Sequence, residues 1–188
     1  MAAQKPITTL SYELTTEKEV GTSYVGRVYA HGKTPLVENA NKPSDCYHGY
    51  AKPGEVAYVL IDNPGVGKLN ICMLRSRRYN DLKFDEAVKA DSQRSKFERL
   101  GKALLGQVLT DLLKLYHPNT ELGITAVSLF GYRQNQLSMR LPQYYLSLGF
   151  TITKTSKSDG WAEMKSTLGT VAKVCADPSR FAAAGSPL

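Results

Sequence analysis

Three cations lie close together at the start of the longest apolar pattern in the chain. Lys96, Arg99 and Lys102 occur within the run K-F-E-R-L-G-K, which is followed by A-L-L-G-Q-V-L. If a helix starts here, its first backbone N–H groups have no intrahelical acceptor and its dipole is positive at this end. A phosphate group could therefore bind at this turn. The alternative is that the three side chains form an ordinary solvated helix face.

A second basic cluster could bind phosphates in a different way. Arg75, Arg77 and Arg78 lie beside Tyr79, and cations next to an aromatic ring can hold a nucleic-acid strand. The whole chain has 24 Lys and Arg against 17 Asp and Glu, a formal net charge of +7. This balance favours a polyanionic partner: nucleic acid, an acidic protein or a phosphorylated cofactor. The competing interpretation of the cluster is a solvated strand end and loop.

Two adjacent tyrosines, Tyr144 and Tyr145, could donate protons. They belong to the run Q-Y-Y-L-S-L-G-F, which ends at Phe150. A tyrosine hydroxyl with its usual pKa of about 10 stays protonated at neutral pH and can act as a general acid. The alternative is that Tyr145 packs in the core beside Phe150.

Composition limits the class of protein. The chain has 188 residues, of which 42% are hydrophobic, so we expect one buried core and a single domain. It has no apolar run of transmembrane length and no apolar N-terminal signal segment, so we expect a soluble, cytoplasmic protein with no membrane partner. The three cysteines, Cys46, Cys72 and Cys175, are widely spaced, which argues against a disulfide framework or a zinc site.

Periodicity predicts the elements that must position these residues. Runs rich in β-formers predict strands over residues 8–15 and 24–30, and a hairpin of residues 54–62 and 68–75 around N-P-G-V-G. Residues 31–53 are expected to form a long loop. It contains His48, which could have a catalytic role, although a solvated loop histidine is the favoured interpretation. A further strand is predicted over 124–130, and a final hairpin over 150–155 and 161–168.

The clearest pattern is a long helix near the middle of the chain. Six apolar residues recur at spacings of three and four: Phe97, Leu100, Leu104, Val108, Leu112 and Leu115. Pro118 disfavours continuation past His117. A second helix is predicted over 134–146, with Pro142 either kinking it or marking its start. Residues 169–188 are expected to be a loosely packed tail. The order of elements predicts an α/β protein with a mixed, mostly antiparallel sheet flanked by helices.

In these landmarks the chain resembles the GCN5-related N-acetyltransferase (GNAT) family. That family has a central strand, a turn that offers backbone amides to the pyrophosphate of acetyl-CoA, and a long helix from that turn. A further strand, a helix ending in Tyr-x-x-x-Gly-Phe and a last hairpin follow. Here G-K-A-L-L from Gly101 is similar to the helix start, Y-L-S-L-G-F from Tyr145 to the signature, and W-A-E-M-K from Trp161 to the final strand. The resemblance covers roughly residues 68–168 and implies a GNAT-like domain over 1–168, followed by the tail.

The resemblance implies roles for particular residues. Lys96, Arg99, Leu100, Gly101 and Lys102 would bind acetyl-CoA, although Arg99 stands where the family has its first loop glycine. Ser138 stands where the family often has an asparagine seven residues before the tyrosine. The Tyr145 hydroxyl would protonate the thiolate leaving group, with Tyr144 taking this role if the register differs by one.

The implied activity is acyl-CoA-dependent N-acylation. An amine of a small molecule, a protein or an aminoacyl group would attack the thioester of acetyl-CoA directly. Lys68 to Arg75 contains no carboxylate, so no general base can be assigned on the central strand. Two other hypotheses remain: a GNAT-fold protein that binds nucleic acid or modifies a base, and a catalytically silent interaction protein.

Overall fold

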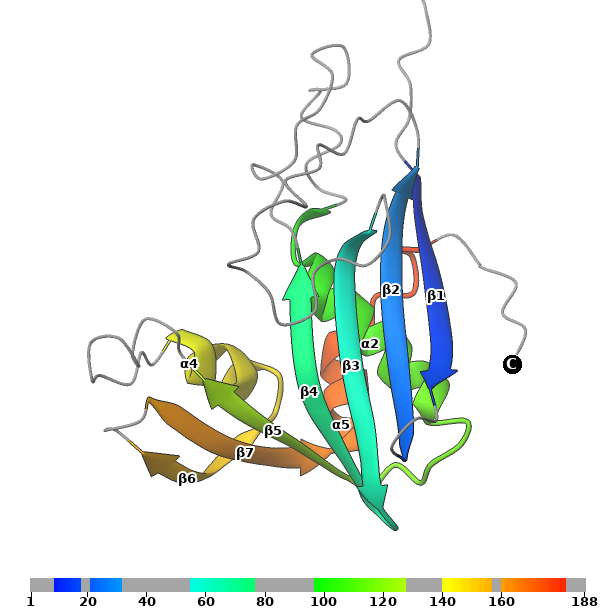
Figure 1. The fold of residues 1–188 in the computed structure, drawn as a ribbon. Coiled ribbons are helices and arrows are strands. Elements are labelled where there is room, and N and C mark those ends of the chain that lie inside the picture. Colours follow the sequence, from blue (N-terminus) through cyan, green and yellow to red (C-terminus); the bar gives the residue numbers. More distant parts are fainter. Residues whose placement is uncertain are drawn as a thin grey trace, which may run out of the picture.

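One seven-stranded sheet organises the structure, a computed structural model in which residues 9–17, 21–31, 55–76, 97–127, 140–156 and 160–181 are described. The strand order is β1-β2-β3-β4-β5-β7-β6 (Figure 1). Every pair of neighbouring strands is antiparallel except β4 and β5, which are parallel. The predicted α/β class with a mostly antiparallel sheet is confirmed.

The first four strands follow one another along the chain and across the sheet. The strand bounds are β1 Thr9–Glu17, β2 Thr22–His31, β3 Glu55–Gly65 and β4 Lys68–Ser76. These strands confirm the two predicted N-terminal strands and the predicted hairpin around the Pro-Gly turn. Apart from His31, the predicted loop over 31–53 lies outside the described residues.

A helical crossover then leads to the second half of the sheet. Helix α2 spans Leu100–Leu112 and strand β5 spans Glu121–Val127, so β5 begins three residues before its predicted start. Helix α4 spans Arg140–Ser147, with Pro142 in its first turn. Backbone N–H groups in the first turn have no acceptor within the helix, so the missing N–H of proline costs no hydrogen bond there. The last hairpin is β6 Thr151–Ser156 and β7 Trp161–Thr167, as predicted.

Helix α2 is the most deeply buried of the described helices. Five of the six residues in its predicted apolar pattern are buried, but Leu115 is 56% exposed. The prediction is wrong for Leu115 because the helix ends at Leu112. Residues 113–115 form a turn, so the helical spacing no longer places Leu115 on the buried face.

The prediction of a loosely packed tail from residue 169 is wrong for its described part. Leu168–Cys175 form helix α5, and the Thr167 side chain caps its N-terminus by accepting a hydrogen bond from the Thr170 N–H. Leu168, Val171, Ala172 and Cys175 recur at spacings of three and one and are buried. Helix α5 packs so closely on α2 that a Cβ added at Gly106 would lie 2.2 Å from the Cys175 carbonyl oxygen.

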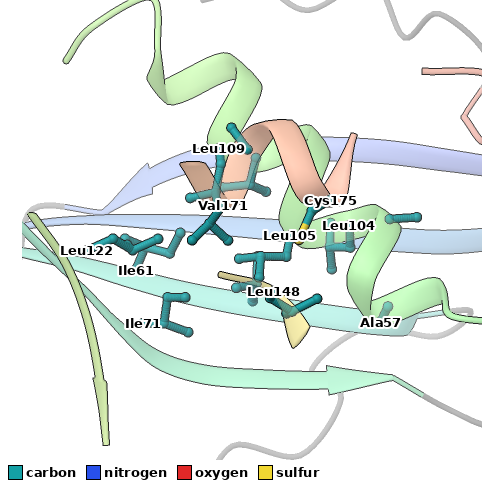
Figure 2. Close-up of a cluster of buried hydrophobic side chains, with 14 of the residues drawn as sticks. Ala57, Ile61, Ile71, Leu104, Leu105, Leu109, Leu122, Leu148, Val171 and Cys175 are labelled. Carbon is teal, nitrogen blue, oxygen red and sulfur yellow. The ribbon is translucent and has the colours of Figure 1, made fainter. Parts of the chain in front are cut away.

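The core lies between the sheet and the helices. Buried side chains of β3, β4 and β5 meet those of α2 and α5, and Leu148, just after α4, joins the same cluster (Figure 2). The end of α4 also contacts α5, since a Cβ at Gly149 would lie 2.9 Å from the Thr170 methyl carbon. The three described helices therefore pack on one side of the sheet, and alternate residues of β4, β5 and β7 face away from them.

Candidate functional site

The parallel pair β4 and β5 separates along its length. The strands pair over only four residues each, from Lys68 opposite Glu121 to Ile71 opposite Ile124. Beyond this point they diverge toward their C-terminal ends (Figure 1). Within the described part of the chain, the facing edges of Cys72–Ser76 and Thr125–Val127 have no strand partner. Backbone N–H and C=O groups along these edges are therefore able to pair with an extended ligand.

A β-bulge marks the point of separation. Ile61 of β3 pairs with Ile71 and Leu60 pairs with Met73, so Cys72 is the extra residue in β4. A bulge re-aims the side chains that follow it. Before the bulge, Leu69 and Ile71 point into the core; after it, Leu74 lies near the α2 residue Gly101.

Three polar side chains from the neighbouring strands β2, β3 and β4 form a hydrogen-bonded group beside the bulge. The Cys72 thiol donates to the Asp62 carboxylate (Sγ to Oδ2, 2.9 Å), and the Ser23 hydroxyl donates to the other oxygen of the same carboxylate (2.7 Å). Partial burial, and then the hydrogen bond and charge of Asp62, raise the pKa of Cys72 to about 12. The thiol is therefore protonated at neutral pH, which disfavours a role as nucleophile.

A polar pocket of about 330 Å³ lies on the face of the sheet that points away from the helices, where β4, β5 and β7 adjoin. Its polar side chains are Asn70, Cys72, Glu121, Thr125, Glu163 and Lys165. Lys165 and Glu121 form an ion pair with a closest N–O distance of 3.1 Å.

The N-terminus of α2 lies against the C-terminal end of β4. A Cβ added at Gly101 would lie 3.1 Å from the Ser76 hydroxyl oxygen, so the absent side chain permits this close packing. No side chain caps the helix, and its first turn contains no acidic residue. The first backbone N–H groups are thus available to an anion at the end of β4.

Arg99 precedes α2 in the left-handed conformation, with φ 53° and ψ 30°. It is the one residue other than glycine with positive φ in the described part of the chain. This conformation favours glycine. Arg99 and Glu98 are exposed, Lys102 is partly exposed, and Leu100 and Gly101 are buried, so the accessible side chains of this turn are two cations and one carboxylate.

The C-terminal segment holds the residue before Arg99 in place. The Arg180 guanidinium donates to the Glu98 carbonyl oxygen (Nη1 to O, 2.9 Å) and forms an ion pair with Asp177 at 3.0 Å. Residues beyond the predicted domain boundary at 168 thus support the turn that precedes α2.

The Tyr145-to-Phe150 signature forms the C-terminal cap of α4. The Phe150 N–H donates to the Tyr145 carbonyl, the Gly149 N–H donates to the Leu146 carbonyl, and Gly149 has a positive φ of 92°. These bonds define a Schellman motif, in which glycine at this position and an apolar contact across the cap are common. That contact is the edge-to-face pair of the Tyr145 and Phe150 rings, whose centroids are 5.7 Å apart.

The two tyrosines differ in their surroundings. Tyr145 is 5% exposed, and burial raises its pKa well above the usual value. Tyr144 is partly buried, and burial followed by the nearby Cys175 thiol raises its pKa to about 12. Burial also raises the pKa of Cys175 to about 11, while Lys102 acts in the opposite direction. Helices α2, α4 and α5 therefore bring Lys102, Cys175 and Tyr144 into one neighbourhood.

Several predicted site residues lie outside the described residues: Lys96, Ser138, Arg77, Arg78 and Tyr79. Arg75 is described and lies partly buried on β4, opposite Tyr58 of β3. The sequence patterns missed the grouping of Cys72, Asp62 and Glu163. Asp62 could be recognised only as a neighbour along the chain, because the register that places it beside Cys72 depends on the bulge.

The described residues give three further observations. No helix among them is long and apolar enough to cross a membrane. They also contain no group of three His, Cys, Asp or Glu side chains arranged to hold a metal ion. Cys72 and Cys175 are both free thiols.

Comparisons with known proteins assign no family. No family model and no curated protein matches the sequence. Among solved structures, the chain is similar to a domain from Methanocaldococcus jannaschii DSM 2661, with a TM-score of 0.41 and 8% identity over 88% of this chain and 69% of that one. A likeness this weak carries neither a family nor a function.

Proposed function

We propose that the chain has a GNAT-like fold and is an acyl-CoA-dependent N-acyltransferase that transfers an acetyl group from acetyl-CoA to an amine. The observation that carries this proposal is the separation of β4 from β5 after four paired residues, with the uncapped N-terminus of α2 at the end of β4. Ligands of open α/β sheets bind beyond the carboxyl ends of parallel strands.

The shape of the donor fits the groups that this region offers. Coenzyme A has an extended arm with two amide groups, which can pair with the edges of β4 and β5 that have no strand partner among the described residues. Its pyrophosphate suits the amides at the start of α2 and the side chains of Arg99 and Lys102. The left-handed backbone of Arg99 also agrees with the proposal, because the family has glycine at this position.

The order of elements gives further support. The chain has a central strand β4, a connection to the long helix α2, then β5, α4 and the β6–β7 hairpin. This is the order expected from the resemblance, including the helix that ends in Tyr145-x-x-x-Gly149-Phe150.

In the proposed reaction the amine nitrogen bonds to the thioester carbonyl carbon, and the carbon–sulfur bond breaks. The thiolate takes a proton from Tyr145, and the amine loses a proton to a base or to water. The Tyr145 hydroxyl is protonated at neutral pH, and burial raises its pKa further, which makes it a weaker acid than an exposed tyrosine.

A pair of tyrosine variants tests the proposed acid. We expect Tyr145→Phe to lower kcat at saturating acetyl-CoA by roughly 10²–10⁴-fold. Tyr144→Phe is the matched control, because it removes the same hydroxyl from the adjacent residue of α4, and we expect it to retain kcat. If the effects are reversed, Tyr144 is the acid; if neither variant loses activity, the proposal that Tyr145 or Tyr144 is the acid is wrong.

A further inference from the structure

The polar pocket on the helix-free face lies at the point where β4 and β5 begin to separate. Its side chains come from three adjacent strands, as Asn70 and Cys72 of β4, Thr125 of β5, and Glu163 and Lys165 of β7. The intervening residues Ile71, Ile124 and Met164 are buried on the opposite side. The pocket therefore adjoins the proposed position of the acyl donor from the side that the described helices leave uncovered.

Gly123 contributes to the form of this pocket. It lies opposite Asn70 in the parallel pair, and a Cβ at Gly123 would lie 2.7 Å from the Asn70 side-chain oxygen. The Asn70 amide thus lies over the glycine, and any larger residue would displace it. At about 330 Å³ the pocket is near the lower limit for small-molecule sites, which suits an unbranched chain of a few atoms.

The pocket has an excess of negative charge although the whole chain is basic. Its lining contains two carboxylates, Glu121 and Glu163, and one ammonium group, that of Lys165. Lys165 is already paired with Glu121. Among the described residues no ion pair involves Glu163, and a third carboxylate, Asp62, lies directly behind the Cys72 thiol. Lys154, the partner of Glu163 on β6, lies over the Trp161 ring and makes no ion pair with Glu163. A cation entering the pocket would therefore meet a carboxylate that no ammonium group of the described residues contacts directly.

We propose, building on the acyltransferase function, that this pocket binds the acceptor as an alkylammonium group and that Glu163 selects for its positive charge. The chain of a lysine side chain or of a small aliphatic amine fits the volume, and the carboxylates attract its ammonium group. The position beside the β4–β5 separation directs the nitrogen toward the acyl donor. The bound ammonium group loses one proton, to Glu163 or to water, before its nitrogen attacks, and the second proton leaves after the carbon–nitrogen bond forms.

Steady-state kinetics with matched acceptors test the role of Glu163. The acceptors are 1,5-diaminopentane, a lysine peptide with a blocked N-terminus, and aniline, which is uncharged at neutral pH. We expect Glu163→Gln to raise KM for alkylamines roughly tenfold or more. KM for aniline and the Kd for acetyl-CoA should not change. Glu17→Gln, at an exposed carboxylate of β1 outside the pocket, should change none of these values. If 1,5-diaminopentane shows the lower KM, the acceptor is a small free amine. If the lysine peptide shows the lower KM, the acceptor is a protein lysine.

A second readout does not depend on the acyl donor. Titration of the ¹⁵N-labelled chain with 1,5-diaminopentane should shift the amide resonances of Gly123 and Thr125, and Glu163→Gln should abolish these shifts. Absence of shifts in the unsubstituted chain, or an unchanged KM for alkylamines in Glu163→Gln, overturns the pocket assignment. Failure of the unsubstituted chain to bind acetyl-CoA while these shifts occur overturns the proposed function instead.

Discussion

The packing of α5 on α2 makes a strong prediction about Gly106. A Cβ at this position would lie 2.2 Å from the carbonyl oxygen and 2.6 Å from the carbonyl carbon of Cys175, against normal C–O contacts of about 3.3 Å. The obstructing atoms belong to the backbone, so Gly106→Ala must move one helix by about 1 Å.

Two effects of this substitution oppose each other. Alanine in a helix interior gains about 1 kcal/mol over glycine, whereas overpacking of a core costs about 1–3 kcal/mol, with backbone clashes at the upper end. We therefore expect Gly106→Ala to lower the free energy of unfolding by about 2 kcal/mol and the Tm by roughly 4–8 °C. Urea and thermal denaturation measure the two quantities.

Gly101→Ala is the control within the same helix. Its Cβ would meet a serine side chain, Ser76, which can rotate, and we expect a change of less than about 1 kcal/mol in either direction. If Gly106→Ala were neutral or stabilising, or if the two variants behaved alike, α5 would not pack on α2 as described.

Three further predictions concern local interactions. Arg99→Gly should raise the free energy of unfolding by about 1 kcal/mol in urea denaturation, because glycine adopts the left-handed conformation without strain; a loss of stability would contradict this. Alkylation of Cys72 by iodoacetamide should be slow at pH 8, since its pKa of about 12 leaves little thiolate, and Asp62→Asn should accelerate it about tenfold for each unit by which the pKa falls. An equal or lower rate in the variant would exclude the hydrogen bond to Asp62. Tyr12→Phe should cost about 2 kcal/mol in urea denaturation, because it removes the buried hydrogen bond to the Asp111 carboxylate (3.0 Å); a neutral effect would contradict that bond.

Local sequence patterns predicted most of the described elements. β-Branched runs located the strands, and spacings of three and four located α2, because burial on one face imposes these periods on the side chains. The pattern of Leu168, Val171, Ala172 and Cys175 marks α5 in the same way. The small, polar residues that follow it led to the wrong expectation of a loose tail.

The pairing of the strands could not be read from the sequence. The parallel alignment of β4 with β5 depends on how α2 crosses the sheet, and the position of Cys72 depends on a register shift opposite Leu60 and Ile61. Both are long-range properties, so the proximity of Asp62 to Cys72 and the pocket at Glu163 leave no local signal.

The signature at the end of α4 shows how one pattern can serve two purposes. Gly149 and Phe150 are explained by the helix cap and its ring contact with Tyr145. The pattern therefore predicts a helix terminus whether or not Tyr145 takes part in catalysis. Only the kinetic comparison with Tyr144 separates the two roles.

Calorimetric titration with acetyl-CoA, with coenzyme A as comparison and at two salt concentrations, tests the proposed function most directly. We expect micromolar binding of both ligands, and weaker binding at the higher salt concentration because phosphates contribute. Absence of binding to the folded chain would contradict an acyl-CoA-dependent activity. The nucleic-acid and protein-interaction hypotheses would then take its place.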